Sequence, residues 1–140
     1  MPFSRYAENK ILDETLGRTN TLDFGSVYLG LSTTTPTESG NTISNITEPS
    51  GNGYARKLIG QYNQALATYF SAASNGSITN DKNIMFEMAT GSWGTCTHAI
   101  LYDASGNVLA WAALTSSISP VANSVPVIVA GGATFSFTHS

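Results

Sequence analysis

The stretch THAILYDASGNVLAWAAL, residues 97–114, constrains the fold more than any other part of the sequence. Two apolar runs flank the short segment ASGN, whose glycine and asparagine favour a tight turn, so the stretch predicts a β-hairpin. In the first run, Ala99 and Leu101 share one face and Ile100 and Tyr102 share the other. A strand that is apolar on both faces is typical of a central strand covered on both sides.

Further segments with strand character surround this hairpin. They are SVYLGLST from Ser26, YARKLIG, SIT, NIMFEM and the closing VPVIVAGGATFSFT, with a turn at Gly131-Gly132 and with Phe135 and Phe137 directed inward. The segment NQALATYFSAA is compatible with either a strand or a helical turn. Short strands separated by turns every ~8–12 residues predict an all-β domain, either a β-sandwich or a jelly-roll-like barrel.

The first 23 residues differ from the rest because nearly half of the charged side chains gather there. The segment SRYAENKILDETLG predicts a short N-terminal α-helix that Ser4 caps and that stops near Gly17. We therefore expect one domain overall, with a helical segment at 1–25 and a β-sandwich body at 26–140.

The helix carries two apolar stripes, one formed by Phe3, Ala7 and Ile11 and the other by Leu12 and Leu16. Two roles remain open. The helix either plugs one end of the β core, or packs on its own domain with one stripe and on a neighbouring subunit with the other.

Composition excludes several classes of partner. Charged residues make up 11% of the chain and the net charge is −3, so no basic face is available for nucleic acid. The longest apolar run, VPVIVAGGA, is shorter than the ~18 residues that a membrane-spanning helix needs. We expect no membrane partner, no signal peptide, and synthesis in the cytoplasm. Cys96 stands alone and is interpreted as a small packed side chain.

The sequence offers no catalytic, cofactor or metal site. Its two histidines, His98 and His139, are far apart in the chain, and no serine lies in a nucleophile elbow. One cysteine and two distant histidines do not make a zinc ligand set. We therefore expect a protein that is not an enzyme and that binds no cofactor.

The segment TEPSGNGYARK, residues 47–57, has the glycines of a ligand loop but fits neither phosphate-binding pattern. Because Gly51, Asn52 and Gly53 readily adopt positive φ, we interpret it as a structural turn before a strand, with a ligand loop as the less favoured reading. It closes a long loop, Thr33 to Gly53, and loops of this length usually carry function or contact a partner.

Several segments in order resemble a family of small proteins from tailed bacteriophages and prophages. They are YAENKILDETLGRT, VYLGLSTTTPTESG, ITEPSGNGYAR, SITNDKNIMFEMATGSWGTCTHAILYDASGNVLAWAAL and PVIVAGGATFSF. The most specific parts are EPSGNGYAR and ATGSWGT.TH. Members are often labelled phage tail fibre proteins, and some are head decoration or cement proteins. The resemblance implies a virion structural protein without catalytic residues.

A fibre shaft usually shows repeats or heptads, and neither is found here. We therefore expect a capsid decoration or cement protein that binds the major capsid protein and stabilises the head shell, as a homo-oligomer, possibly a trimer. The alternative is a tail fibre or tail-tip protein in host adsorption, in which an exposed Trp93 or Tyr62 would stack on glycan. A glycan-active enzyme using Glu87 or Asp103 is a third reading.

Ten residues are the candidates for partner contact. They lie in the helix and in the loop: Tyr6, Lys10, Ile11, Leu16, Thr47, Glu48, Pro49, Asn52, Tyr54 and Arg56. Trp93 and Trp111 are expected in the core.

Overall fold

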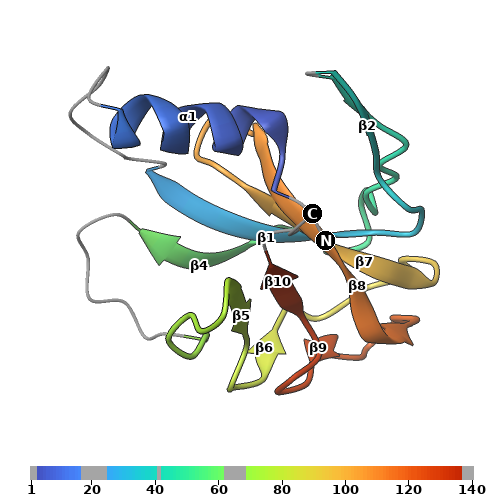
Figure 1. The fold of residues 1–140 in the computed structure, drawn as a ribbon. Coiled ribbons are helices and arrows are strands. Elements are labelled where there is room, and N and C mark those ends of the chain that lie inside the picture. The colour runs from blue at the N-terminus through green and yellow to red at the C-terminus, as the bar shows by residue number, and fades with distance from the viewer. Residues whose placement is uncertain (1–2, 17–24, 41, 62–68, 137–140) are drawn as a thin grey trace.

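A computed structural model describes residues 3–16, 25–40, 42–61 and 69–136. Within these ranges the chain forms one α-helix and ten short strands (Figure 1). The elements are α1 (Arg5–Thr15), β1 (Ser26–Ser32), β2 (Thr37–Ser39), β3 (Thr42–Ser44), β4 (Lys57–Gln61), β5 (Ser77–Thr79), β6 (Ile84–Met85), β7 (Cys96–Tyr102), β8 (Val108–Ile118), β9 (Val127–Ile128) and β10 (Thr134–Ser136).

A four-stranded antiparallel sheet in the order β4-β1-β7-β8 forms the centre of the molecule. The predicted hairpin is confirmed as β7 and β8. Its turn is closed by hydrogen bonds between Asp103 and Asn107 and between Gly106 and Asp103. The position of β7 between β1 and β8 also confirms the prediction of a central strand.

The two faces of this sheet are covered by different elements, as Figure 1 shows. One face carries Leu29, Leu31 and Ala99, which pack with Trp93 and Phe135 in the larger core cluster beneath the sheet. Two small antiparallel ribbons, β5–β10 and β6–β9, lie on this side. The result is a layered, sandwich-like all-β domain, and no strand set within the described ranges closes into a barrel.

The opposite face carries a smaller apolar cluster of Ile100, Tyr102 and Trp111. Ile43 and Ile46, from β3 and the segment after it, pack against this cluster. Helix α1 and the β2–β3 hairpin lie on this side in Figure 1. Both predicted core tryptophans are confirmed, since Trp93 is 5% exposed and Trp111 is 2% exposed.

Helix α1 is fastened to β8 at its N-terminal end. Ser4 caps the helix as predicted, because its Oγ accepts a hydrogen bond from the backbone N–H of Ala7 at 3.2 Å. The same hydroxyl donates to the carbonyl of Val108, and the backbone N–H of Ser4 donates to the carbonyl of Leu109 at 2.7 Å. Phe3 forms a β-bridge with Ala110. The start of the helix is therefore held on the β body by hydrogen bonds to β8.

Two expectations about loops differ from the structure. The segment from Thr33 to Gly53 contains the hairpin β2–β3, which binary patterning did not reveal because both strands are short and rich in Thr and Ser. The hydroxyls of Thr37 and Ser44 pair across this hairpin at 3.0 Å. The two closing strands do not pair with each other, since β9 pairs with β6 and β10 pairs with β5.

Phe135 is buried as predicted. The expectations for Phe137, Gly17, Tyr62 and His139, and for most of NQALATYFSAA, fall on residues outside the described ranges.

Candidate interaction surfaces

Glu48, Tyr54 and Arg56 form a closed polar network inside the predicted contact loop. The guanidinium of Arg56 donates two hydrogen bonds to the Glu48 carboxylate, at 2.8 and 2.9 Å. The Tyr54 hydroxyl donates to Glu48 Oε2 and accepts from the backbone N–H of Leu31 at 3.0 Å. This arrangement is the two-pronged Arg–carboxylate geometry that gives strong, directional pairing. These three side chains are therefore used within the fold.

Electrostatics in this network follow from its geometry. Burial tends to raise the pKa of Glu48, but the hydrogen bonds from Arg56 and Tyr54 outweigh it and hold the pKa below its ordinary value. Burial and the bond to Glu48 raise the pKa of Tyr54, and the bond to Glu48 raises the pKa of Arg56. Glu48 and Arg56 are therefore held as an ion pair at neutral pH.

Tyr102 and Gly30 also pack closely around this ion pair. The Arg56 guanidinium carbon lies 3.5 Å from the centroid of the Tyr102 ring, a cation–π contact. A Cβ at Gly30 would lie 2.8 Å from Glu48 Oε2 and 2.9 Å from both Tyr102 and the Tyr54 hydroxyl. Position 30 of β1 must therefore be glycine for the carboxylate and the two rings to meet over the sheet.

The loop is also docked onto residues 88–93. The Asn52 carbonyl accepts hydrogen bonds from the backbone N–H of Thr90 at 2.9 Å and from Trp93 Nε1 at 2.8 Å, and its side-chain amide donates to the carbonyl of Ser92 at 3.0 Å. The Tyr54 ring meets the Trp93 ring edge-on, with centroids 5.1 Å apart. The two most specific sequence segments, EPSGNGYAR and ATGSWGT, therefore bind each other.

The structure shows a turn rather than a phosphate loop at residues 51–54, where Tyr54 N–H donates to the Gly51 carbonyl at 3.0 Å. Among the other loop candidates, Thr47 and Asn52 are exposed and Pro49 is half-buried. Thr47 is tied to β1, because its backbone N–H donates a hydrogen bond to the side-chain Oγ of Ser32 at 3.1 Å. What this loop offers to a partner is a hydrogen-bonded, mostly neutral outer surface.

The helix candidates lie on a second surface. Ala7 is buried against the body, Ile11 is half-buried, and Leu16 is 81% exposed. Lys10 Nζ lies 5.8 Å from the centroid of the Tyr6 ring. Leu12, which belongs to the same outer stripe as Leu16, is also exposed. The helix therefore presents one apolar stripe inward and the other outward.

Tyr6 also connects the helix to the β7–β8 turn, since its hydroxyl donates to Asp103 Oδ2 at 2.9 Å. Asp103 accepts further hydrogen bonds from the backbone N–H groups of Ser105 and Asn107, both at 2.9 Å. Burial tends to raise the pKa of Asp103, but the bonds from Asn107, Tyr6 and Ser105 lower it overall. Asp103 is thereby a structural turn residue rather than a general acid.

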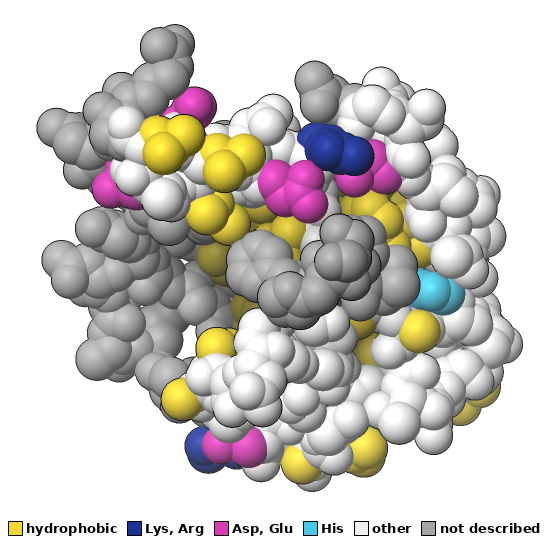
Figure 2. Space-filling model, in the orientation of Figure 1, with side chains coloured by type: hydrophobic (Ala, Val, Ile, Leu, Met, Phe, Trp, Pro, Cys, Tyr) yellow, Lys and Arg dark blue, Asp and Glu magenta, His cyan; other side chains and the backbone are white. Residues whose placement is uncertain are grey.

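Sequence reasoning missed a third surface, on the β6–β9 ribbon. Five exposed apolar residues lie there or in its extensions: Met85, Met88, Val121, Val125 and Val129. The consecutive apolar residues in NIMFEM and VPVIV could have indicated it, because a peripheral ribbon that is apolar on both faces leaves one of these faces outside. Figure 2 shows apolar side chains along the lower rim of the molecule, below the position of the small ribbons in Figure 1.

Other kinds of site are not found in the part of the chain that the structure describes. No group of three His, Cys, Asp or Glu side chains there could hold a metal ion. Burial raises the pKa of the Cys96 thiol to about 11. None of the described helices has the length and apolar character to cross a membrane. Trp93, a proposed sugar platform, is buried.

A comparison with protein families finds a model that matches almost the whole chain. The family model described as "Podophage GP4 fiber I protein gp80" matches residues 2–136. No curated protein matches the chain. The match runs from before α1 to the end of β10, and so includes all three surfaces.

Proposed function

The chain belongs to the family of podophage GP4 fiber I protein gp80, and from that membership we propose that it is a component of a phage tail fibre that acts by binding other virion proteins. The family is one of phage virion and fibre proteins, so the chain is a virion structural protein. The observation that carries the proposal is the extent of the match, residues 2–136, because it covers the whole described body.

The geometry supports a binding role without catalysis. The polar residues that chemistry could have used, Glu48, Tyr54 and Asp103, are engaged in hydrogen bonds that fasten turns and strands. The outward stripe of α1 and the ribbon β6–β9 leave apolar side chains exposed. A sparsely charged surface of this kind loses little free energy by desolvation when neighbours pack against it.

The compact body refines what kind of fibre component this is. With no long shaft in the described ranges, the chain acts as a globular unit of a fibre, such as a base, joint or tip, rather than as the shaft itself. We propose that several copies associate in the virion, and that each makes modest contacts that add up across the assembly. The trimer expected from the sequence stays a prediction.

The second candidate is a capsid decoration protein bound to the major capsid protein. The observation that favours it is the same compact, repeat-free body, since decoration proteins gain stability by bridging capsid subunits and need no shaft. In that case the helix stripe and the loop 47–56 would face the shell.

Labelling of intact particles separates the two candidates. An antibody against the chain, with its position read by electron microscopy, is expected to mark the tail region. Uniform labelling of the head would support decoration instead, and an increase in the rupture temperature of stripped capsids on addition of the purified chain would confirm it. Particles without any label, in which mass spectrometry also fails to find the chain, would contradict both.

A further inference from the structure

The chain contains two Asn–Gly dipeptides, Asn52–Gly53 and Asn75–Gly76. An asparagine followed by glycine can lose its side-chain amide without an enzyme. The backbone nitrogen of the glycine attacks the asparagine Cγ, an N–Cγ bond forms, and the side-chain nitrogen leaves as ammonia. Water then opens the resulting succinimide ring at one of its two carbonyl carbons, which gives aspartate or isoaspartate. Glycine favours this reaction because it has no Cβ to obstruct the ring.

The two dipeptides match in backbone conformation and in exposure. Asn52 and Asn75 have φ values of 52° and 54°, and the glycines that follow them have φ values of 80° and 73°. All four residues are exposed. Ring closure requires torsion angles that differ from those of a left-handed turn residue, so its rate depends on how often each turn opens. The contacts that hold each turn closed therefore decide which asparagine reacts.

A neighbouring segment holds Asn52 in place. The Asn52 carbonyl accepts hydrogen bonds from the Thr90 N–H at 2.9 Å and from Trp93 Nε1 at 2.8 Å. Its side-chain amide donates to the Ser92 carbonyl at 3.0 Å. A Cβ at Gly91 would lie 2.7 Å from the Asn52 Cγ, so the backbone at Gly91 packs against the carbon at which the ring must close. Opening this turn breaks three hydrogen bonds and a close contact.

Far fewer contacts hold Asn75, which lies at the tip of a two-residue hairpin turn. Ser74 and Ser77 close the turn through two backbone hydrogen bonds, at 2.8 and 3.0 Å. Positive φ at both central residues makes this a type I′ turn, for which Asn–Gly is a preferred pair. Within the described ranges the Asn75 side chain makes no hydrogen bond. The turn therefore favours the reactive pair and leaves its amide uncovered.

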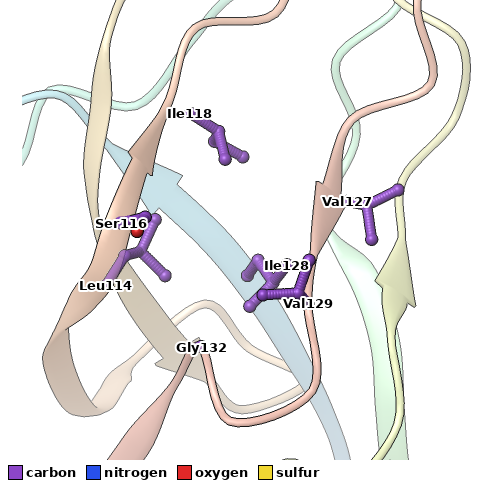
Figure 3. A pocket seen from close by; sticks show the side chains of 7 residues that line it. All are labelled: Leu114, Ser116, Ile118, Val127, Ile128, Val129 and Gly132. Atoms are coloured by element: carbon purple, nitrogen blue, oxygen red, sulfur yellow. The ribbon is translucent and has the colours of Figure 1, made fainter.

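The far end of β5 stays anchored when this turn opens. Asn80, which follows β5, is 1% exposed. Its amide donates to the Val129 carbonyl at 2.8 Å, and its Oδ1 accepts from the Ala133 N–H at 2.9 Å. Figure 3 shows where this anchor lies, because Val129 lines with Leu114 a small hollow of about 80 Å³ between β8 and β9. The anchor belongs to the body, so residues 74–77 can open locally while the body stays folded.

We propose that Asn75 is a site of spontaneous deamidation, whereas the fold protects Asn52. Each event consumes one water molecule, releases one ammonia and adds one negative charge to the chain. In the isoaspartate product the backbone runs through the former side chain and gains one methylene group, so the two-residue type I′ turn no longer fits. This turn also forms one wall of an apolar hollow of about 220 Å³ beside Phe3 and Phe135. A virion protein is not replaced after assembly, so the product accumulates as particles age.

Peptide mapping of the full chain by mass spectrometry tests the difference between the two sites. Purified protein is held at mildly alkaline pH, and trypsin separates the sites because Lys57 lies between them. We expect deamidation at Asn75 to be faster than at Asn52 by about tenfold or more in the folded chain. In urea, where both asparagines lose their surroundings, the two rates should agree within about twofold. Equal rates in the folded chain, an unreactive Asn75, or the same preference in urea would each overturn the proposal.

Asn75→Gly is the matched control variant, because Gly–Gly also suits a type I′ turn but has no amide to lose. Fresh wild type and fresh variant are expected to unfold at similar temperatures. After ageing, the Tm of the wild type should fall in proportion to its isoaspartate content, and that of the variant should stay constant. An unchanged Tm in a wild-type sample rich in isoaspartate would overturn the effect on the turn. None of these measurements uses particles, so their outcome is independent of the virion role.

Discussion

The loop at residues 47–56 and the ribbon β6–β9 are both surface regions, but their side chains differ in how far they bond within the chain. The loop turns its polar side chains onto itself and its neighbours, through the Glu48–Arg56 pair and the hydrogen bonds of Asn52 to residues 90–93. The ribbon leaves five apolar side chains half-exposed and one carboxylate, Glu87, without an ion-pair partner in the described ranges.

This difference separates residues that stabilise the fold of a single chain from residues that remain free to contact other chains. Substitutions in the loop break hydrogen bonds and close packing that exist in a single chain, so they should destabilise the isolated protein. Substitutions at the five exposed apolar side chains of this ribbon and its extensions, which we call the β6–β9 patch, remove little that a single chain uses, so they should act on assembly. These side chains are Met85, Met88, Val121, Val125 and Val129. Four substitutions, one of them also followed as a function of pH, test this contrast, and they are given in order of decreasing effect on the stability of the isolated chain.

Gly53→Ala should have the largest effect, a loss of about 3 kcal/mol in the free energy of unfolding. Gly53 has a φ of +80°, and a Cβ there would lie 2.6 Å from the backbone carbonyl oxygen of Met88. The positive φ and the close approach to the Met88 carbonyl oxygen both disfavour an alanine side chain here. Gly51→Ala is the matched control, because Gly51 has a φ of +72° but nothing within 4 Å of its Cβ position. Urea denaturation should give only about 1 kcal/mol for the control; equal losses would mean that docking onto residues 88–90 is unimportant.

Glu48→Ala should cost about 2 kcal/mol, because it leaves the Arg56 guanidinium and the Tyr54 hydroxyl without their acceptor in a half-buried place. Glu87→Ala, at an exposed position just after β6, is the control and should change the stability by less than about 0.5 kcal/mol. Thermal denaturation of dilute samples measures both.

The dependence of the folding stability on acidic pH gives a second test of Glu48. Its pKa in the folded chain lies below the ordinary value of 4.5, so the ionised form stabilises the fold above pH 4.5 and this contribution is lost as the pH falls through the lower, folded-state pKa. The wild type should therefore lose more stability than Glu48→Ala between neutral pH and pH values below 4.5. Parallel pH profiles for the two proteins would show that the ion pair contributes nothing.

Asn52→Gly should cost about 1 kcal/mol. Glycine accepts the φ of 52° at this position, so the substitution isolates the loss of the side-chain hydrogen bond to the Ser92 carbonyl. The backbone hydrogen bonds to Thr90 and Trp93 should persist, and the near-ultraviolet circular dichroism of the tryptophans should stay close to that of the wild type. A loss of several kcal/mol would mean that the amide organises the whole turn.

Val125→Thr should have the smallest effect, below about 0.5 kcal/mol in dilute solution, because Val125 is 41% exposed and its neighbours hold the ribbon through backbone hydrogen bonds. Concentrated samples should behave differently, since association stabilises the folded chain by mass action. The Tm of the wild type should rise with concentration more than that of Val125→Thr. A large loss in dilute solution would make the ribbon part of the fold and break the contrast with the loop.

Local patterns were sufficient to predict most of the central sheet and the helix. The alternation in β1 and β7, the turn ahead of Val108 and the Ser4 cap are short-range signals, and each acts in the structure as the pattern indicates. The hairpin β2–β3 could not be predicted in this way, because its strands have three residues each, are rich in Thr and Ser, and show no apolar alternation.

The role of the loop was the harder part, because it depends on contacts between distant segments. Nothing in EPSGNGYAR reveals that Asn52 meets Trp93, or that Glu48 and Arg56 close over a glycine of β1. The exposure of the β6–β9 patch was missed for a related reason. An unbroken apolar run such as VPVIV indicates that a strand has two apolar sides, but only the tertiary arrangement decides which side lies against the core.

Oxidative footprinting of Met85 and Met88 tests the central claim most directly, since methionine oxidation follows solvent access to the thioether. Both side chains are about half-exposed in the single chain, at 53% and 52%. If the chain is a virion component whose β6–β9 patch is covered by contacts, both methionines should be oxidised readily in the dilute purified chain and resist oxidation in intact particles. Equal oxidation in the two samples, or absence of the chain from purified particles, would contradict the claim.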